Sequence, residues 1–345
     1  MITVRPYRLQ DEEKWNGFVD AVDQGTVFHK IVWKKIIERT YGYKACYLLA
    51  SEDDEIVGIL PLFHLKSVFI GNALLSTPFA AYGGVIATNK EVEDRLIAAA
   101  KNCAKDRRAT YIELRQFSAL ENETLQTRDS LYVTFFRELI PEDQEQNFKN
   151  LPREAHRMVR RGSDKGLEVR LATDAVDEFY EIYAASVRNL GTPVFPKALF
   201  KNCLELMDDN ADLLMVYQQK KAIAGVLSFY YKRTVLPYYG GSLPEANYLG
   251  PNNYMYWKLM EHAAQRGCTC FDFGRSKNKT GAFNFKRHMG FKPKPLPYQY
   301  LMMNGRDLPN LNPTNPKFKL AINMWRKLPL GVTKAIGPRI VKEFP

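Results

Sequence analysis

EIVGILPLF, residues 55–63, and AIAGVLSFY, residues 222–230, repeat one pattern in the two halves of the chain. Each is an apolar run of strand length that follows a short polar turn, as buried β-strands commonly do. A second pair of similar stretches, AAYGGVIAT at 80–88 and PYYGGSLPE at 237–245, follows in the same order. Self-similarity over so long a period predicts two related structural units in tandem.

Helices and strands are expected in the same order in both halves. Amphipathic periodicity predicts helices over 91–107, 176–190, 196–207 and 253–266. Apolar runs bounded by turns predict strands over 45–51, 56–65, 110–115, 213–218, 222–231 and 269–273. This alternation predicts an α/β (α+β) fold.

The 345 residues are many for a single core, so we expect more than one domain. The repeat places an N-terminal domain at 1–150 and a C-terminal domain at 151–310. A basic amphipathic tail over 311–345 follows. We expect this tail to pack on the first domain or on a membrane surface, and the sequence favours neither.

The charge balance favours an anionic partner. Lysine and arginine number 49 against 38 acidic residues, which gives a net charge of +11. Such an excess suits nucleic acid, a phosphorylated or nucleotide-linked substrate, or an acidic membrane surface. A general solubility charge explains it equally well.

The cysteines indicate a reducing compartment and no metal site. Their number is odd, and no pair or Cys/His cluster has metal-ligand spacing. The N-terminus lacks an apolar signal core, and no apolar run approaches membrane-spanning length. We therefore expect a cytoplasmic protein, soluble or peripheral at the inner membrane face. The five thiols belong to Cys46, Cys103, Cys203, Cys268 and Cys270.

Two basic segments are candidates for anion binding. FDFGRSKNKTGAFNFKRHMGF, residues 271–291, places Arg275, Lys277 and Lys279 just beyond a predicted strand, at a sheet edge where open α/β folds bind ligands. LPREAHRMVRRGSDKGLEVRLA, residues 151–172, is expected to begin as a helix that carries its arginines on one face. Like charges on one helix face repel, and an anion would relieve that repulsion; a solvated basic face is the alternative. These arginines are Arg153, Arg157, Arg160 and Arg161.

Order and motifs resemble one known family across nearly the whole chain. The matching stretches are FHKIVWKKIIERTYGYKACYLLA (28–50), GILPLF (58–63), LLSTPFAAYGG (74–84), 271–291 as quoted above, and NPKFKLAINMWRKLPL (315–330). They resemble the FemAB-like branch of the GNAT acyltransferases, in particular the members associated with PEP-CTERM/exosortase and exopolysaccharide loci. The resemblance implies two tandem GNAT-like domains with mixed, mostly antiparallel sheets flanked by helices.

The resemblance also implies an activity. FemAB relatives transfer an amino acid from aminoacyl-tRNA to an amine of a peptidoglycan precursor. By resemblance, this chain is an acyl- or aminoacyltransferase for a cell-envelope or exopolysaccharide precursor. Its expected partners are an anionic small-molecule or lipid-linked saccharide or peptide acceptor and tRNA, with peripheral membrane contact through the tail.

The residues themselves favour direct transfer without a covalent intermediate. No G-x-S-x-G elbow or recognisable cysteine–histidine nucleophile motif is present. We expect no tightly bound cofactor, with aminoacyl-tRNA or acyl-CoA as co-substrate. CoA-dependent GNAT enzymes hold the pyrophosphate in a Q/R-x-x-G-x-G/A turn at a helix start. Here EANYLGPNNYMYW, residues 245–257, has Gly250 followed by Pro251, which lacks an N–H group, and this departure weighs against CoA.

Lys286 and Asp272 are the candidate catalytic residues. Lys286 matches the lysine of the family's F-K-x-x-x-G pattern, which by resemblance faces the reaction centre and contacts acceptor phosphates or the developing oxyanion. The alternative is a lysine that extends over neighbouring phenylalanines. Asp272 either acts as a base or orients Arg275, and a purely structural hydrogen bond is the more common role for such a residue. The candidate substrate-binding residues are Arg157, Arg160, Arg161, Tyr239, Tyr256, Arg275, Lys277 and Lys279, although most tyrosines serve packing.

Two other functions stay open from the sequence. One is an acyl-CoA-dependent N-acetyltransferase acting on an amino sugar. The other is a non-catalytic GNAT-like protein that binds a polyanion or serves as a scaffold.

Overall fold

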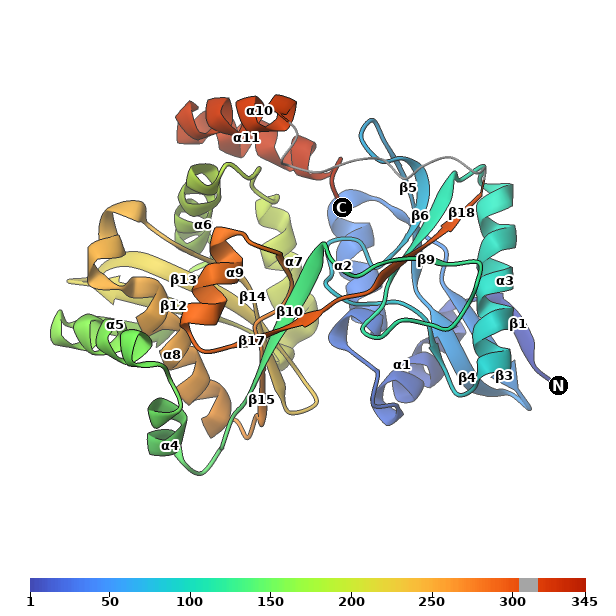
Figure 1. Ribbon diagram of the computed structural model, residues 1–345, viewed down its shortest axis with the longest axis horizontal. Coiled ribbons are helices and arrows are strands. Elements are labelled where there is room, and N and C mark those ends of the chain that lie inside the picture. The colour runs from blue at the N-terminus through green and yellow to red at the C-terminus, as the bar shows by residue number, and fades with distance from the viewer. Residues whose placement is uncertain (304–315) are drawn as a thin grey trace. The chain divides into compact units, whose positions relative to one another are not determined.

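The computed structural model describes residues 1–303 and 316–345, and the side chains of 1–303 and 320–345. The chain divides into two compact units. Unit 1 comprises Met1–Tyr132, Pro295–Leu311 and Lys342–Pro345, and unit 2 comprises Val133–Lys294 and Asn312–Val341. Both units combine sheets with flanking helices (Figure 1).

Unit 1 contains two sheets with strand orders β1-β3-β4-β7 and β2-β5-β6-β8-β18-β9. Helix α3 packs against β3, β4 and β8, and its buried face joins the apolar core that includes Leu60, Leu74 and Ile112. The elements are β1 (Thr3–Pro6), α1 (Glu12–Ala21), α2 (Ile31–Tyr41), β2 (Lys44–Ala45), β3 (Leu48–Glu52), β4 (Glu55–Leu60), β5 (Leu62–Ser67), β6 (Gly71–Ser76), β7 (Ile86–Ala87), α3 (Lys90–Asp106), β8 (Tyr111–Arg115), β9 (Gln126–Arg128) and β18 (Tyr298–Met302).

Unit 2 is built on a sheet of order β11-β12-β13-β14-β15-β10-β16, with β17 paired to β10. Helices α6 and α7 pack on one face, and α8 packs on the other with α5 beside it (Figure 1). The elements are β10 (Tyr132–Glu138), α4 (Gln144–Lys149), α5 (Arg153–Asp164), β11 (Leu167–Leu171), α6 (Val176–Leu190), α7 (Lys197–Met207), β12 (Ala211–Gln218), β13 (Lys221–Tyr231), β14 (Thr234–Ser242), α8 (Pro251–Gln265), β15 (Cys270–Asp272), β16 (Ser276–Lys277), α9 (Gly281–His288), β17 (Lys292–Pro295), α10 (Pro316–Lys327) and α11 (Leu330–Val341).

The predicted repeat is confirmed in the strand pairing. An antiparallel pair, β5–β6 in unit 1 and β13–β14 in unit 2, leads in each case through a helix to a strand that pairs in parallel. That strand is β8 beside β6 and β15 beside β14. The expected fold of two tandem, mostly antiparallel GNAT-like domains is therefore observed.

The two copies differ where the sequence has Pro61. The single strand predicted over 56–65 is two strands, β4 and β5, which belong to different sheets of unit 1. Proline has no N–H to donate and interrupts a ladder of hydrogen bonds. The equivalent β13 runs unbroken, with register shifts against β14 between Leu227 and Ser228 and against β12 opposite Val216 and Tyr217.

The domain limits differ from those predicted at 150 and 310. Strand β10 pairs with β15, which assigns residues 133–150 to unit 2, and β18 pairs with β8, which returns 295–303 to unit 1. The boundary at 310 lies outside the described residues. Both corrections have one cause: strand pairing joins segments that are distant in the sequence.

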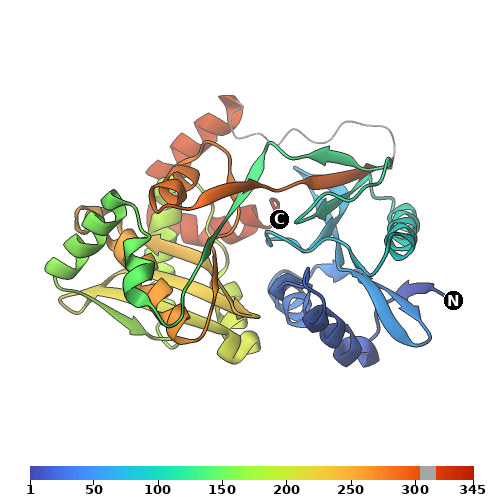
Figure 2. The same cartoon turned by 60° about the horizontal axis from the view of Figure 1, so that its bottom comes forward.

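The tail packs partly on each unit. Lys342–Pro345 belong to unit 1, where Tyr43 Oη donates to Lys342 O at 2.6 Å and Ser67 Oγ donates to Glu343 O at 2.8 Å. Helices α10 and α11 contact α6 of unit 2 (Figures 1 and 2), and Lys334 forms an ion pair with Glu181. Trp325 is buried, whereas Leu320 and Met324 remain exposed. The expected packing on the first domain is therefore observed for Lys342–Pro345 and not for α10 and α11, and contact with a membrane stays a prediction. No helix in the described part of the chain is long and apolar enough to cross a bilayer.

In unit 1, the end of the parallel pair is closed by the chain's own backbone. Gly83 N donates to Arg115 O at 3.1 Å across the end of β8. The guanidinium of Arg115, only 2% exposed, donates to the carbonyls of Thr77, Ala80 and Pro345 and pairs with Glu113 at 2.8 Å. One buried cation thus joins the loop at 77–80 to the C-terminal residue Pro345.

We expect Arg115→Leu to lower the free energy of unfolding by about 3–5 kcal/mol, because the buried Glu113 carboxylate and the carbonyls would lose their partner. The matched control is Arg95→Leu, which removes a half-exposed guanidinium paired with Glu91 and is expected to change it by about 1 kcal/mol or less. Urea denaturation followed by circular dichroism measures both. Equal losses in the two variants would contradict this role of Arg115.

Candidate functional site

In unit 2, the parallel strands β14 and β15 separate after two residue pairs. Thr234 lies opposite Cys270 and Val235 opposite Phe271. Beyond them, Phe273 N donates to Phe135 O of β10 at 2.8 Å, so the chain leaves β14, which continues to Ser242 paired with β13. The side chains at this divergence form the candidate site.

Tyr256 of α8 lies at the divergence. Its ring packs edge-on against Phe273, with centroids 4.5 Å apart, and near Phe285. A Cβ added at Gly240 of β14 would lie 2.6 Å from the Tyr256 hydroxyl oxygen, so the glycine makes this close approach possible. Burial raises the pKa of Tyr256 well above its ordinary value. The phenol therefore keeps its proton and serves as a neutral hydrogen-bond donor.

Asp272 fixes the turn that follows β15. Its carboxylate, 3% exposed, accepts a hydrogen bond from Gly274 N at 2.9 Å and one from Thr134 Oγ1 at 3.4 Å. Gly274 has φ +67°, a conformation that residues with a Cβ rarely adopt. These contacts are those of the structural alternative considered from the sequence, and a catalytic role for Asp272 stays a prediction.

Lys286 points back from α9 into this turn. Helix α9 begins where Thr280 Oγ1 accepts from Phe283 N at 3.3 Å, which sets the helix so that Lys286 faces inward. The Lys286 ammonium donates to Gly274 O at 2.9 Å and Arg275 O at 3.3 Å, and the residue is 9% exposed. The inward position differs from that of a lysine extended over the helix surface.

The pKa of Lys286 falls to about 7. Burial is the main cause, the carboxylate of Asp272 opposes it, and the guanidinium of Arg275 lowers the pKa further. Two aromatic rings face the ammonium, those of Phe273 at 5.2 Å and Phe135 at 5.5 Å from the ring centres. The side chain therefore exists in both protonation states close to neutral pH.

The other cations of the loop that follows β15 differ in how far they are exposed. Arg275 and Lys277 are half-buried, and Lys279 is exposed with φ +59°. Burial lowers the pKa of Lys277, and the charge of Arg275 lowers it further. Arg275 is thus close enough to repel both Lys277 and Lys286.

The arginines of α5 form a second basic region. Arg157 pairs with Glu154, and Arg160 lies over the ring of Phe148 with its guanidinium carbon 6.0 Å from the centroid. With Arg153 and Arg161 they line a surface hollow of about 1100 Å³ on the exposed face of the helix. The predicted helix with one arginine face is observed, and substrate binding by Arg157, Arg160 and Arg161 stays a prediction.

The start of α8 is shaped for packing. Gly250, with φ +72°, precedes Pro251 at the first helical position. A Cβ at Gly250 would lie 2.9 Å from the Met158 methyl and 3.1 Å from its carbonyl oxygen. Helix α5 thus approaches the position at which CoA-dependent GNAT enzymes hold a pyrophosphate, and the glycine is explained by this contact.

Tyr239 lies on the opposite face of β14 from Gly240. Its ring packs among those of Tyr183, Phe195 and Phe200, and the residue is 3% exposed. The structure does not bring it to the Lys286 turn. A substrate contact for Tyr239 stays a prediction.

Sequence reasoning missed Arg137. This residue of β10 has its guanidinium 4.7 Å from the centre of the Phe291 ring, and burial lowers its pKa. A Cβ at Gly290 would lie 2.3 Å from its Nη2. The glycine in KRHMGF was the available signal, because it marks a close approach. Among the described residues, no three histidine, cysteine or acidic side chains gather as metal ligands.

Residues 146–287 match the acetyltransferase (GNAT) domain family in sequence. A comparison with curated proteins found no match. The residues that match this family include the divergence of β14 and β15 and Lys286.

Solved structures share the fold over most of the chain. FemX aligns with a TM-score of 0.70 at 16% identity, covering 87% of this chain and 98% of FemX. The C-terminal domain of a putative lysylphosphatidylglycerol synthetase from Agrobacterium fabrum aligns with a TM-score of 0.59 at 13% identity, covering 86% and 92%. A tandem GNAT protein from the clavulanic acid biosynthesis pathway aligns with a TM-score of 0.56 at 9% identity, covering 89% and 100%. These likenesses confirm the fold expected from the resemblance to FemAB-like GNAT proteins.

The pKa of Lys286 predicts a pH-dependent stability. Between its folded value of about 7 and its ordinary value of 10.5, the unfolded chain binds the proton that the folded chain releases. The free energy of unfolding should therefore rise with pH across this window, by up to about 1.4 kcal/mol per pH unit from this group. Urea denaturation at neutral and mildly alkaline pH measures the slope.

Lys286→Met should lose this contribution, and Lys279→Met, which removes an exposed ammonium, should retain it. The informative quantity is the difference between each variant and the wild type at each pH. Parallel stability curves for the wild type and Lys286→Met would show that the buried lysine keeps its proton throughout.

Proposed function

We propose that this protein transfers an acyl or aminoacyl group to an amine of an anionic cell-envelope or exopolysaccharide precursor. The observation that carries the proposal is the crowding of three cations, Arg275, Lys277 and Lys286, at the end of β15 in a GNAT domain. Burial and the charge of Arg275 lower the pKa of both lysines. A negatively charged reactant would relieve this repulsion, and so would an oxyanion formed during the reaction.

Lys286 is suited to two tasks in such a transfer. The acceptor amine attacks the acyl carbonyl carbon, a C–N bond forms, and the carbonyl oxygen becomes an oxyanion. The attacking nitrogen must then lose a proton, and a lysine with a pKa of about 7 can accept it at neutral pH. In its protonated form the same group stabilises the oxyanion. The bond to the leaving group breaks as the intermediate collapses.

Tyr256 supplies a donor at the same divergence of β14 and β15. Because burial raises its pKa, its hydroxyl stays protonated and can donate to the oxyanion or to the leaving group. Phe273 lies against both Tyr256 and Lys286, which places the two polar ends around one aromatic ring. Gly240 keeps the space beside the hydroxyl free of a Cβ.

The remaining cations are proposed to bind the phosphates of the donor or the acceptor. Arg275 can bind two oxygens with its planar guanidinium, whereas Lys277 and Lys279 act as flexible point charges. The arginine face of α5 lines a hollow large enough for a phosphorylated group. An anionic acceptor agrees with the net charge of +11. By its name, the lysylphosphatidylglycerol synthetase neighbour joins a lysyl group to an anionic lipid, which supports an acceptor of this kind.

An aminoacyl-tRNA donor is favoured over acyl-CoA. Met158 packs against Gly250 at the start of α8, and Pro251 offers no N–H to a pyrophosphate. The acyl-CoA alternative, N-acetylation of an amino sugar, has one observation in its favour. The tandem GNAT neighbour is described in a form without acetyl-CoA, which associates that protein with this donor.

A donor screen separates these proposals. Purified protein is incubated with radiolabelled aminoacyl-tRNA or acetyl-CoA, together with a nucleotide-linked amino sugar or a lipid-linked muropeptide, and the labelled acceptor is quantified. Label transferred from aminoacyl-tRNA supports the proposal, and label from acetyl-CoA alone supports the alternative. Binding of tRNA or heparin with no product from either donor would replace both by a non-catalytic polyanion-binding role.

Lys286→Ala is expected to reduce turnover at least about tenfold, since one charge-assisted contact contributes about 1.5–3 kcal/mol. The pH profile distinguishes catalysis from folding. The wild-type kcat should change slope close to pH 7, where Lys286 titrates, and the residual activity of Lys286→Ala should lack this change. Wild-type turnover in a folded Lys286→Ala variant would exclude the residue from the reaction.

Arg275→Gln is expected to have two linked effects. Loss of the guanidinium should raise the pKa of Lys286 and shift the change in the kcat profile to higher pH. It should also weaken the binding of inorganic pyrophosphate by roughly tenfold, measured by calorimetry. Lys279→Gln is the control for exposed charge and should leave the profile in place. An unshifted profile in Arg275→Gln would mean that this charge does not act on Lys286.

A further inference from the structure

The helices of the tail expose large apolar side chains although they are docked on unit 2. On α10, Leu320 is 64% exposed and Met324 is 63% exposed, and on α11 Val332 and Ile336 are exposed as well. Among the described residues, the other large apolar side chain exposed on an α-helix is that of Leu190, at the end of α6. Exposed apolar residues on α-helices are therefore concentrated in the tail and in the helix that it contacts.

Helix α10 has one buried side and one exposed side. Trp325 is buried, and the helix contacts α6. Leu320, Met324 and Lys327 are all exposed and are spaced i, i+4 and i+7. Residues with this spacing share one side of a helix, which here is turned away from Trp325. The exposed side of α10 is thus an apolar stripe that ends in a cation.

Helix α11 repeats this arrangement. Its buried residues include Thr333 and Gly337, which lie one turn apart. Val332, Ile336 and Arg339 are exposed and again have the spacing i, i+4 and i+7. Both helices therefore use one side for packing and leave a second side that combines two large apolar residues with a basic one.

The two helices also carry cations without acids. From the start of α10 to the end of α11, the sequence contains six lysines and arginines and no aspartate or glutamate. Lys334 is paired with Glu181 of α6. Within the part of the chain that the structure describes, Arg326, Lys327 and Arg339 form no ion pair. The exposed sides are thus positively charged as well as apolar.

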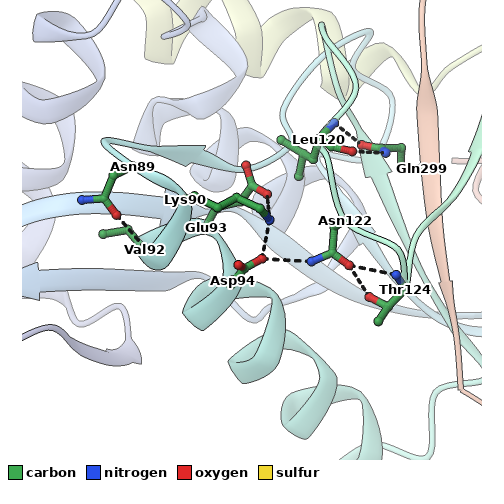
Figure 3. A network of polar contacts seen from close by, with 9 residues as sticks. All are labelled: Asn89, Lys90, Val92, Glu93, Asp94, Leu120, Asn122, Thr124 and Gln299. Atoms are coloured by element: carbon green, nitrogen blue, oxygen red, sulfur yellow. Dashed lines mark hydrogen bonds and ion pairs between the residues drawn. The ribbon is translucent and has the colours of Figure 1, made fainter.

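Helix α3 of unit 1 shows how a solvated helix face is built in the same chain (Figure 3). Its 17 residues contain four cations and four acids, and none of its large apolar side chains is exposed. Lys90 donates to Glu93 at 2.8 Å and to Asp94 at 2.5 Å. Asp94 also accepts from Asn122 at 3.0 Å. The exposed sides of α10 and α11 lack both the paired charges and the absence of apolar residues that are typical of a face in contact with water.

An anionic lipid surface matches both properties of these exposed sides. Basic amphipathic helices lie in the plane of a bilayer surface, where the apolar side enters the boundary between headgroups and acyl chains and the cations contact lipid phosphates. Each helix has 12 residues, a length of about 18 Å at the helical rise of 1.5 Å per residue. Neither therefore reaches across a hydrocarbon core of about 30 Å, and the contact would be peripheral.

A second copy of this chain fits these sides less well. In a dimer with two-fold symmetry the same surface meets itself. Lys327 and Arg339 would then approach the cations of the other copy, and neither helix carries a carboxylate to pair with them. A lipid surface supplies the missing negative charge.

We propose that α10 and α11 bind the surface of an anionic phospholipid bilayer through their exposed apolar stripes, with Lys327 and Arg339 at the lipid phosphates. The sequence left docking and membrane contact as alternatives for the tail, and in this proposal each takes one side of the same helices. The proposal is independent of the acyl transfer proposed for unit 2, because it concerns binding to lipid and not turnover.

The first test measures binding of the full chain to lipid vesicles by co-sedimentation. Vesicles of phosphatidylcholine alone are compared with vesicles that also contain phosphatidylglycerol. Binding should be at least about tenfold tighter with the anionic lipid, because each cation near such a surface contributes roughly fivefold. Equal binding to both kinds of vesicle, or binding to neither, would overturn the proposal.

Variants of exposed apolar residues locate the contact without changing the core. The double variant Met324→Gln, Ile336→Gln should bind anionic vesicles at least about tenfold more weakly, since both changes remove apolar surface from the contact. Leu171→Gln changes an exposed apolar residue of β11, is the matched control and should bind as the wild type does. Circular dichroism establishes that the variants are folded. Wild-type binding by the double variant would overturn the proposal.

Variants of the cations separate this contact from a general attraction due to the net charge of +11. The double variant Lys327→Gln, Arg339→Gln should weaken binding to anionic vesicles about tenfold or more. Arg157→Gln, which removes one charge from the arginine face of α5, is the control and should change binding little. A greater loss in Arg157→Gln than in the double variant would place the lipid contact on α5 and overturn the proposal.

Analytical ultracentrifugation of the protein without lipid tests the second-copy alternative. The oligomeric state should be the same in the wild type and in Met324→Gln. A wild-type dimer that dissociates in Met324→Gln would overturn the proposal, because the stripe of α10 would then be covered by another chain.

Discussion

The buried ammonium of Lys286, held by the carbonyls of Gly274 and Arg275, is the contact on which the architecture of unit 2 converges. Those carbonyls are available because Gly274 takes a left-handed conformation, and the turn is fixed because Asp272 accepts from its N–H. This turn forms where the chain after β15 separates from β14 and bonds to β10. The change of strand partner therefore creates the buried position in which the pKa of Lys286 is lowered.

Both units contain a parallel strand pair, but the residues at the end of that pair differ between the two units. In unit 1 the end of the parallel pair is spanned by backbone, with the guanidinium of Arg115 saturated by three carbonyls and a carboxylate. In unit 2 the corresponding place is lined by side chains, among them Tyr256 and Lys286. The buried cation of unit 1 is therefore stabilised by its partners, whereas burial lowers the pKa of the buried lysine in unit 2.

Much of this arrangement could be predicted from the sequence, because it is local. The repeat, most of the helices and the placement of Lys286 beyond a buried strand follow from apolar periodicity and from the family motif. The segment exchange at residues 132 and 295 could not be predicted, since pairing of β10 with β15 and of β18 with β8 leaves no local period. Such pairing depends on proximity in space, which spacing along the chain does not encode.

The position of β18 between β8 and β9 has a consequence for biosynthesis. During translation, residues 1–132 emerge from the ribosome long before Tyr298–Met302, and β10 to β17 are synthesised in between. Until then, the β8 edge of the first unit exposes unpaired backbone, which is a template for wrong pairing. The N-terminal unit therefore completes this sheet only after β10 to β17 of the second unit have been synthesised.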